Sequence, residues 1–115
     1  MANTFKVITK AGVTSADVIY TVAGSTTTVI LGLILGNTTS SSINATVTLG
    51  TDTGNRSGAN NEANQAVELL TTTPIPGNST LELLAGNKVV METTDTLSVT
   101  GSGAVDVALS VMEIT

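Results

Sequence analysis

The sequence predicts an all-β protein, an antiparallel β-sandwich of about eight or nine strands with a jelly-roll-like arrangement. The chain has 115 residues, of which 41% are hydrophobic and only 11% are charged, so one domain with a buried core is expected. Its 22 Thr residues, together with many Val and Ile, favour strands over helices. Short apolar runs alternate with Gly, Asn, Ser and Pro, which is typical of a sandwich or barrel.

The predicted strands follow one another at short spacing within a single domain, residues 1–115. They are Thr4–Lys10, Asp17–Val22, Thr26–Gly36, Ser42–Gly50, Gln65–Thr72, Ser79–Leu84, Lys88–Glu92, Thr96–Thr100 and Ala104–Ile114. Turn residues separate them at Ala23–Ser25, Gly36–Ser42, Pro74–Asn78 and Gly101–Gly103. The "AGNK" of Ala85–Lys88 places Gly-Asn between two strand-like runs, which predicts a hairpin there.

Alternation of apolar and polar residues assigns faces to two of these strands. In the fourth strand, one face holds Ile43, Ala45, Val47 and Leu49. In the last strand, one face holds Val105, Val107, Leu109 and Val111. Met112 and Ile114 fall out of phase with this row, so we expect a β-bulge near them or a strand that leaves the sheet.

The run "TTTVILGLILGN", Thr26–Asn37, carries no charge and is apolar on both of its predicted faces. We expect one face to hold Val29, Leu31, Leu33 and Leu35, and the other to hold Ile30 and Ile34 with Gly32 between them. Because a sandwich strand is normally polar on its outer side, something must cover this second face.

Two covers are possible for the second face: a loop or terminus of the same chain, or another subunit. Another subunit is the favoured interpretation, since an exposed uncharged strand is prone to aggregate. The expected oligomer or virion interface consists of Ile30, Gly32, Ile34, Met112 and Ile114.

The composition argues against an enzyme and against a bound cofactor or metal. There is no His and no Cys, which removes the usual general base, thiol nucleophile and soft metal ligands. Asp17, Glu82, Glu92 and Asp95 are scattered, and we expect them in turns and on solvated outer faces. No two of them have a convincing spacing for paired carboxylates.

The polar segment Thr51–Glu62 is the longest predicted loop, and its oxygen-rich composition raises the question of calcium. An EF-hand loop that began at Asp52 would have Gly54 and Arg56 at its third and fifth positions, so the pattern fails. An irregular site for a hard ion, drawing on Asn55, Asn60, Asn61 or Glu62, remains an alternative to a plain flexible loop.

Charge and aromatic content bear on the possible partners. A net charge of −5 with four basic residues leaves no patch that could follow a phosphate backbone, so we expect no nucleic acid. The run "VILGLIL" is too short to cross a bilayer. The start "MANTFKVITK" lacks a secretory pattern, so synthesis in the cytoplasm and no membrane insertion are expected.

The two aromatic residues, Phe5 and Tyr20, are expected to pack in the core rather than to form a stacking platform for sugars. Sugar binding through the polar loops remains an alternative. Four N-x-S/T triplets, at Asn37, Asn44, Asn55 and Asn78, are no more than a chain this rich in Asn, Ser and Thr would hold by chance.

Two segments carry a resemblance to a known class of proteins. They are "VIYTVAGSTTTVILGLILGNTT" (Val18–Thr39) and "PIPGNSTLELLAGNKVVMETTDTLSVTGSGAVDVALSVMEIT" (Pro74–Thr115). Together they resemble small virion structural proteins of tailed bacteriophages, especially marine and cyanobacterial phages. The shared parts are the Tyr-Thr-Val opening, the apolar strand ending in Asn-Thr-Thr, the Pro-x-Pro-Gly turn and the terminal "DVALSVMEIT".

The resemblance implies a compact β-sandwich that is a component of the virion. Phage proteins of this size commonly decorate the capsid as cement proteins, often as trimers seated where capsomers meet, in contact with the major capsid protein. Others belong to the neck, tail or fibre apparatus. The expected function is thus a non-enzymatic, homo-oligomeric capsid decoration protein, with a neck, tail or fibre component or a glycan- or protein-binding module as the alternative.

Overall fold

The computed structural model describes residues 2–51, 66–84 and 86–115, and all regular structure in this part of the chain is β-strand. The strands are β1 (Asn3–Val13), β2 (Asp17–Thr21), β3 (Thr27–Asn37), β4 (Ile43–Gly50), β5 (Ala66–Ile75), β6 (Ser79–Leu83), β7 (Val89–Met91), β8 (Thr96–Gly101) and β9 (Val105–Ile114). Each strand predicted from the sequence is present, with ends that differ by a few residues. The predicted all-β sandwich is confirmed.

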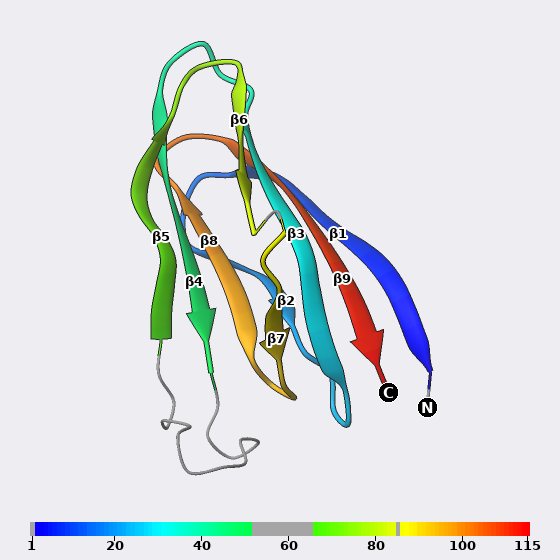
Figure 1. Cartoon of the computed structure of the whole chain (residues 1–115). Coiled ribbons are helices and arrows are strands. Elements are labelled where there is room, and N and C mark those ends of the chain that lie inside the picture. The colour runs from blue at the N-terminus through cyan, green and yellow to red at the C-terminus, as the bar shows by residue number, and fades with distance from the viewer. Residues whose placement is uncertain (1, 52–65, 85) are drawn as a thin grey trace.

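The strands form two antiparallel sheets that pack against each other (Figure 1). Sheet A has the order β1-β9-β3-β6, with β7 also paired to β3, and sheet B has the order β2-β8-β4-β5. Because β6 and β7 pair with successive parts of β3, they act as one interrupted edge strand. The result is two sheets of four strand positions whose connections cross between them, the arrangement of a jelly roll.

The hairpin predicted at Ala85–Lys88 is wrong. β6 and β7 do not pair with each other but both run antiparallel to β3, β6 along Leu33–Asn37 and β7 along Thr28–Ile30. Gly86 has a φ of 84°, as a Gly-Asn turn would need, but the chain continues along the same edge instead of reversing. Pairing with the long central strand has overridden the local turn signal.

The core lies between the two sheets and is made almost entirely of aliphatic side chains. The faces predicted for β4 and β9 are confirmed, since Val47, Leu109 and Val111 are fully buried and the other members of both rows are buried or half-buried. Met112 and Ile114 lie on the opposite side of β9 without any bulge in that strand, since β9 pairs with β1 in steady register from Val107 to Ile114. β9 therefore neither bulges nor leaves the sheet there, and the nearby β-bulge lies instead in its partner β3, opposite Ser110 and Val111.

The faces predicted for β3 are only partly right, because the strand contains a β-bulge. Ile30 pairs with Val111 and Gly32 pairs with Ser110, so Leu31 is an extra residue that shifts the alternation by one. Ile30 consequently lies in the core with Leu33 and Leu35, all three with no exposed surface. Val29, Gly32, Ile34 and Gly36 alternate with these buried positions and lie on the outer face.

Candidate functional site

The outer faces of the two sheets differ in chemistry. Along the two central strands of sheet B, β4 and β8, the outward residues are polar: Asn44, Thr46, Thr48, Ser98 and Thr100. Hydroxyl groups on these positions are readily solvated, so this face needs no cover. The central strands of sheet B therefore have the polar outer side that is usual for a sandwich, and the exposed large apolar side chains of sheet B, Val18 (55%) and Val67 (49%), lie on its edge strands β2 and β5.

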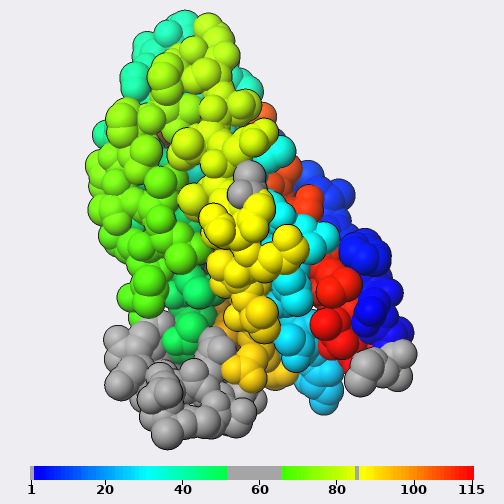
Figure 2. Space-filling model, in the orientation of Figure 1, coloured from blue at the N-terminus to red at the C-terminus, as the bar shows by residue number. Residues whose placement is uncertain are grey.

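The outer face of sheet A is apolar and uncovered. Its large exposed side chains are Phe5 (70% exposed), Val7 (64%), Val90 (55%) and Ile34 (44%). They lie on β1, β7 and β3, with Met112 and Ala108 of β9 between them. Figure 2 shows these strands side by side in blue, red, cyan and yellow, with no other described segment over them.

We call this surface the sheet A face and define it by three rows of residues that pair across β1, β9 and β3. The rows are Phe5–Met112–Val29, Val7–Ser110–Gly32 and Thr9–Ala108–Ile34. Val90 extends the first row onto β7. None of these residues is charged, although the chain has a net charge of −5.

Part of this surface was predicted from the sequence. Gly32, Ile34, Met112 and Ile114 lie on the outer side of sheet A, and their role in an interface remains a prediction. Ile30 does not belong to the face, since the bulge at Leu31 turns its side chain into the core.

Phe5 and Val7 were not predicted to lie on this surface, and the expectation that Phe5 packs in the core is wrong. Their alternation with Lys6 and Ile8 is visible in the sequence, but it favours the wrong side for the core, because the side with Phe5 and Val7 is the more apolar one. Ile8 pairs with the buried Leu109, which shows that Ile8 is on the inner side and Phe5 and Val7 on the outer side.

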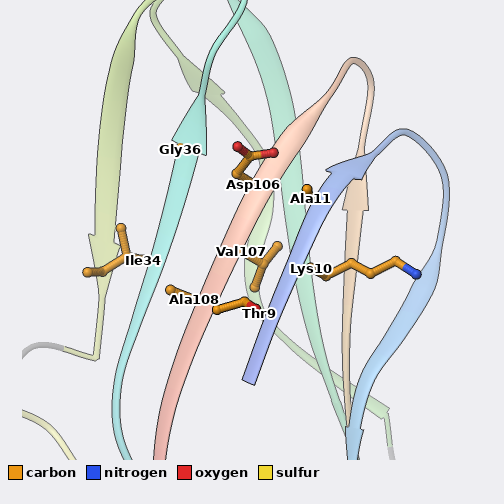
Figure 3. A pocket seen from close by; sticks show the side chains of 8 residues that line it. All are labelled: Thr9, Lys10, Ala11, Ile34, Gly36, Asp106, Val107 and Ala108. Carbon is orange, nitrogen blue, oxygen red and sulfur yellow. The ribbon is translucent and has the colours of Figure 1, made fainter. Parts of the chain in front are cut away.

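A hollow of about 360 Å³ lies on the sheet A face, open to solvent. The hollow forms because Gly36 and Ala108 have little or no side chain. Thr9 and Ile34 stand on either side of Ala108 (Figure 3). Asp106 lies at one end, where its Oδ1 accepts a hydrogen bond of 2.9 Å from the backbone N–H of Gly12. The lining is mainly aliphatic, which suits an apolar side chain better than a polar ligand.

A small polar cluster joins the two sheets at the end of the sandwich near the N-terminus. Tyr20 of β2 donates a hydrogen bond of 2.5 Å from its hydroxyl to Glu113 Oε2 and lies 2.8 Å from Thr28 Oγ1. Lys6 Nζ lies 2.8 Å from Glu113 Oε1. Every buried side-chain donor and acceptor among the described residues has a partner, so the cluster is satisfied internally.

The electrostatics of this cluster match a structural role. Burial, followed by the hydrogen bond to Glu113, raises the pKa of Tyr20 to about 12. Hydrogen bonds from Lys6 and then Tyr20 hold the pKa of the Glu113 carboxyl below its usual range. At neutral pH the tyrosine is thus neutral and the carboxylate ionised, the states that these hydrogen bonds require.

The remaining carboxylates can be checked as possible metal ligands in the described part of the chain. No three of its Asp and Glu residues come together as potential metal ligands. Asp95 corrects one expectation, because it is fully buried rather than solvated, and its Oδ2 accepts a hydrogen bond from the Glu92 backbone N–H. The possible ion ligands Asp52, Asn55, Asn60, Asn61 and Glu62 lie outside the described residues.

Comparison with known proteins does not place the chain in a family. No protein-family model and no curated protein sequence matches the chain. Among solved structures, the chain is similar to a chain from the study titled "Bacillus endospore appendages form a novel family of disulfide-linked pili". The TM-score is 0.48 at 14% identity, over 99% of this chain and 87% of that one. Within the described residues, no helix is long and apolar enough to span a membrane.

Proposed function

We propose that this protein is a non-enzymatic structural subunit of a larger assembly and that it associates with copies of itself through the sheet A face. The observation that carries the proposal is the contrast between the two sides of the sandwich, one polar and one apolar. Four exposed side chains on the apolar side, Phe5, Val7, Ile34 and Val90, are between 44% and 70% exposed. An apolar surface of this kind marks an interaction site on a soluble domain.

The assembly we propose is the virion of a tailed bacteriophage, in which the protein decorates the capsid shell. The resemblance of Val18–Thr39 and Pro74–Thr115 to small virion proteins supports this part of the proposal. In this role the major capsid protein is the partner beneath the subunit, and the protein reaches the particle after synthesis in the host cytoplasm. A neck, tail or fibre position is the alternative within the virion.

Replacement of Ile34 by Asp tests the self-association. Ile34 is 44% exposed, so a carboxylate there stays solvated in the free subunit but is desolvated when the face is covered. Ile34→Asp is expected to give a folded monomer by circular dichroism and sedimentation velocity, while the unmodified protein associates. Val18→Asp is the matched control, because Val18 is 55% exposed on β2 of the other sheet.

Two results would contradict this part of the proposal. One is an unmodified protein that is monomeric at micromolar concentration. The other is equal association of the Ile34→Asp and Val18→Asp variants.

The location is tested separately by counting copies of the protein in purified virions with quantitative mass spectrometry. Hundreds of copies per particle are expected for a decoration protein. A dozen or fewer would place the protein in the neck or tail instead. Absence from the particle, combined with binding to a glycan array, would replace the virion proposal with that of a glycan-binding module.

A further inference from the structure

The most exposed large side chain of the sheet A face, Phe5, and the hollow around Ala108 are separated along the strands. Phe5, the single Phe of the chain, is 70% exposed in the first row of the face. The hollow lies around Ala108 in the third row. Four residues of strand separate the two rows, which corresponds to about 13 Å.

The hollow has the size and the chemistry to receive a phenyl ring. Apolar cavities of about 150 Å³ in protein interiors can hold benzene, and this hollow has a volume of about 360 Å³. Gly36 and Ala108 form its floor, Thr9 and Ile34 stand on either side of Ala108, and Asp106 lies at one end. Phe5 of the same subunit cannot reach it, since both belong to the same rigid sheet.

The middle row of the face lies halfway between Phe5 and the hollow. It consists of Val7, Ser110 and Gly32, two of which have small side chains. A two-fold axis that runs across the strands over this row would place Phe5 of each copy above the hollow of the other. The sideways offset from β1 to β9 is one strand spacing, about 4.8 Å, which lies within the reach of a Phe side chain.

The charge and the size of the face also favour a second copy as its partner. The three rows carry no charge across β1, β9 and β3, so two copies can meet there despite a net charge of −5 on each, while Glu82 extends the third row onto β6. The eleven residues of β3 span about 36 Å and four strands span about 19 Å. The whole outer side of sheet A, including β6, is therefore about 700 Å² per copy, so full overlap of two copies would bury at most about 1,400 Å², an upper limit that lies within the range of stable protein interfaces.

We propose that two copies of this chain pack face to face through sheet A, with Phe5 of each copy inserted into the hollow over Ala108 of the other. The inference rests on the proposed self-association and adds its symmetry and its contact residues. The interface is isologous, because the same surface serves both partners. The repeating unit is therefore a two-fold pair, rather than the trimer that the resemblance implies.

Thiol cross-linking with a short bifunctional maleimide tests the contact, because the chain has no Cys of its own. In the variant Phe5→Cys/Ala108→Cys, the two positions of one chain are about 14 Å apart, whereas across the proposed interface they are about 11 Å apart. A disulfide is too short for either distance, so the reagent is chosen to span the shorter distance only. It is expected to give a covalent dimer of twice the 11.5 kDa subunit mass on a denaturing gel. Each single variant is expected to remain uncross-linked, because two-fold symmetry keeps equivalent positions apart.

A second variant measures the same contact without cross-linking. Ala108→Leu fills the hollow on an exposed surface, so the subunit is expected to fold normally. Its dimer dissociation constant is expected to rise at least tenfold by sedimentation equilibrium. Val18→Leu, on the opposite sheet, is the control and should leave the constant unchanged.

Three results would overturn the inference: a ladder of polymers, a covalent trimer, or no cross-link in a protein that still associates. If Ile34→Asp abolishes association while the Cys pair does not cross-link and Ala108→Leu has no effect, the proposed function stands and the two-fold contact does not. If the unmodified protein is monomeric, both are refuted.

Discussion

A buried amide, that of Asn37, joins two turns at one end of the sandwich, and a single-atom change tests its contribution. Its Nδ2 donates to the carbonyl oxygens of Ser41, Ile75 and Pro76 at 2.8, 2.9 and 3.2 Å. Its Oδ1 accepts from the backbone N–H and the hydroxyl of Thr39 at 2.9 and 2.7 Å. The residue is 2% exposed, so its N-x-T triplet is not an accessible glycosylation site.

The variant Asn37→Asp keeps the shape of the side chain but replaces the donor with an oxygen. Three carbonyl oxygens then face a carboxylate, and their hydrogen bonds to Nδ2 are lost. A lost hydrogen bond costs about 1 kcal/mol, and a buried acceptor left without a donor costs about 1–3 kcal/mol. We therefore expect the free energy of unfolding to fall by about 3–5 kcal/mol, a large part of the ~5–15 kcal/mol typical of a domain.

Urea unfolding followed by circular dichroism measures this loss at pH 7. The deficit should shrink towards pH 4, because the surrounding carbonyls favour the protonated acid and so raise its pKa in the folded state. A group with a raised folded pKa contributes stability at low pH, which is lost as the pH rises through that pKa.

Asn44→Asp is the matched control, because Asn44 is exposed and also begins an N-x-T triplet. It should change the stability by less than about 0.5 kcal/mol. Equal stability of the two variants would refute the assigned role of the Asn37 amide.

Two further predictions concern the interior of the sandwich. The pKa of Tyr20 is raised to about 12, so an unfolded chain loses this proton at lower pH than the folded one. Stability should therefore fall between pH 10 and 12, by at most about 2 kcal/mol because Tyr20 is partly exposed to solvent, and Tyr20→Phe should lose this alkaline dependence in urea titrations. Gly101→Ala would place a Cβ 2.5 Å from the backbone oxygen of Val13. It should lower stability by about 1–3 kcal/mol in a thermal melt, whereas Gly24→Ala, with no atom within 4 Å of the added Cβ, should not.

Strand positions and the inward rows of β4 and β9 could be predicted from the sequence, because both depend on local properties. Thr, Val and Ile suit extended backbone, and Gly, Asn and Pro interrupt it at the turns. A regular two-residue alternation also assigns a face without reference to any partner strand. The rows from Ile43 and from Val105 meet this condition.

The predictions that failed depend on which strands are neighbours. The bulge at Leu31 places Ile30 in the core. It can be recognised only from the pairing of β3 with β9, which continues on both sides of the extra residue. The Gly-Asn sequence before β7 has the residues of a hairpin, but β7 has β3 as its partner instead.

The sequence by itself determined that this chain forms β-strands, where most of them lie, and that a reactive centre built on His or Cys is absent. Only the tertiary structure decided which side of β1 faces outward, that Phe5 and the hollow over Ala108 share one surface, and that sheet B is polar where sheet A is apolar. The physical reason is that each residue's own side chain determines its preference for extended backbone. The side that a strand turns to solvent depends instead on its hydrogen-bond register with strands that are distant in the sequence.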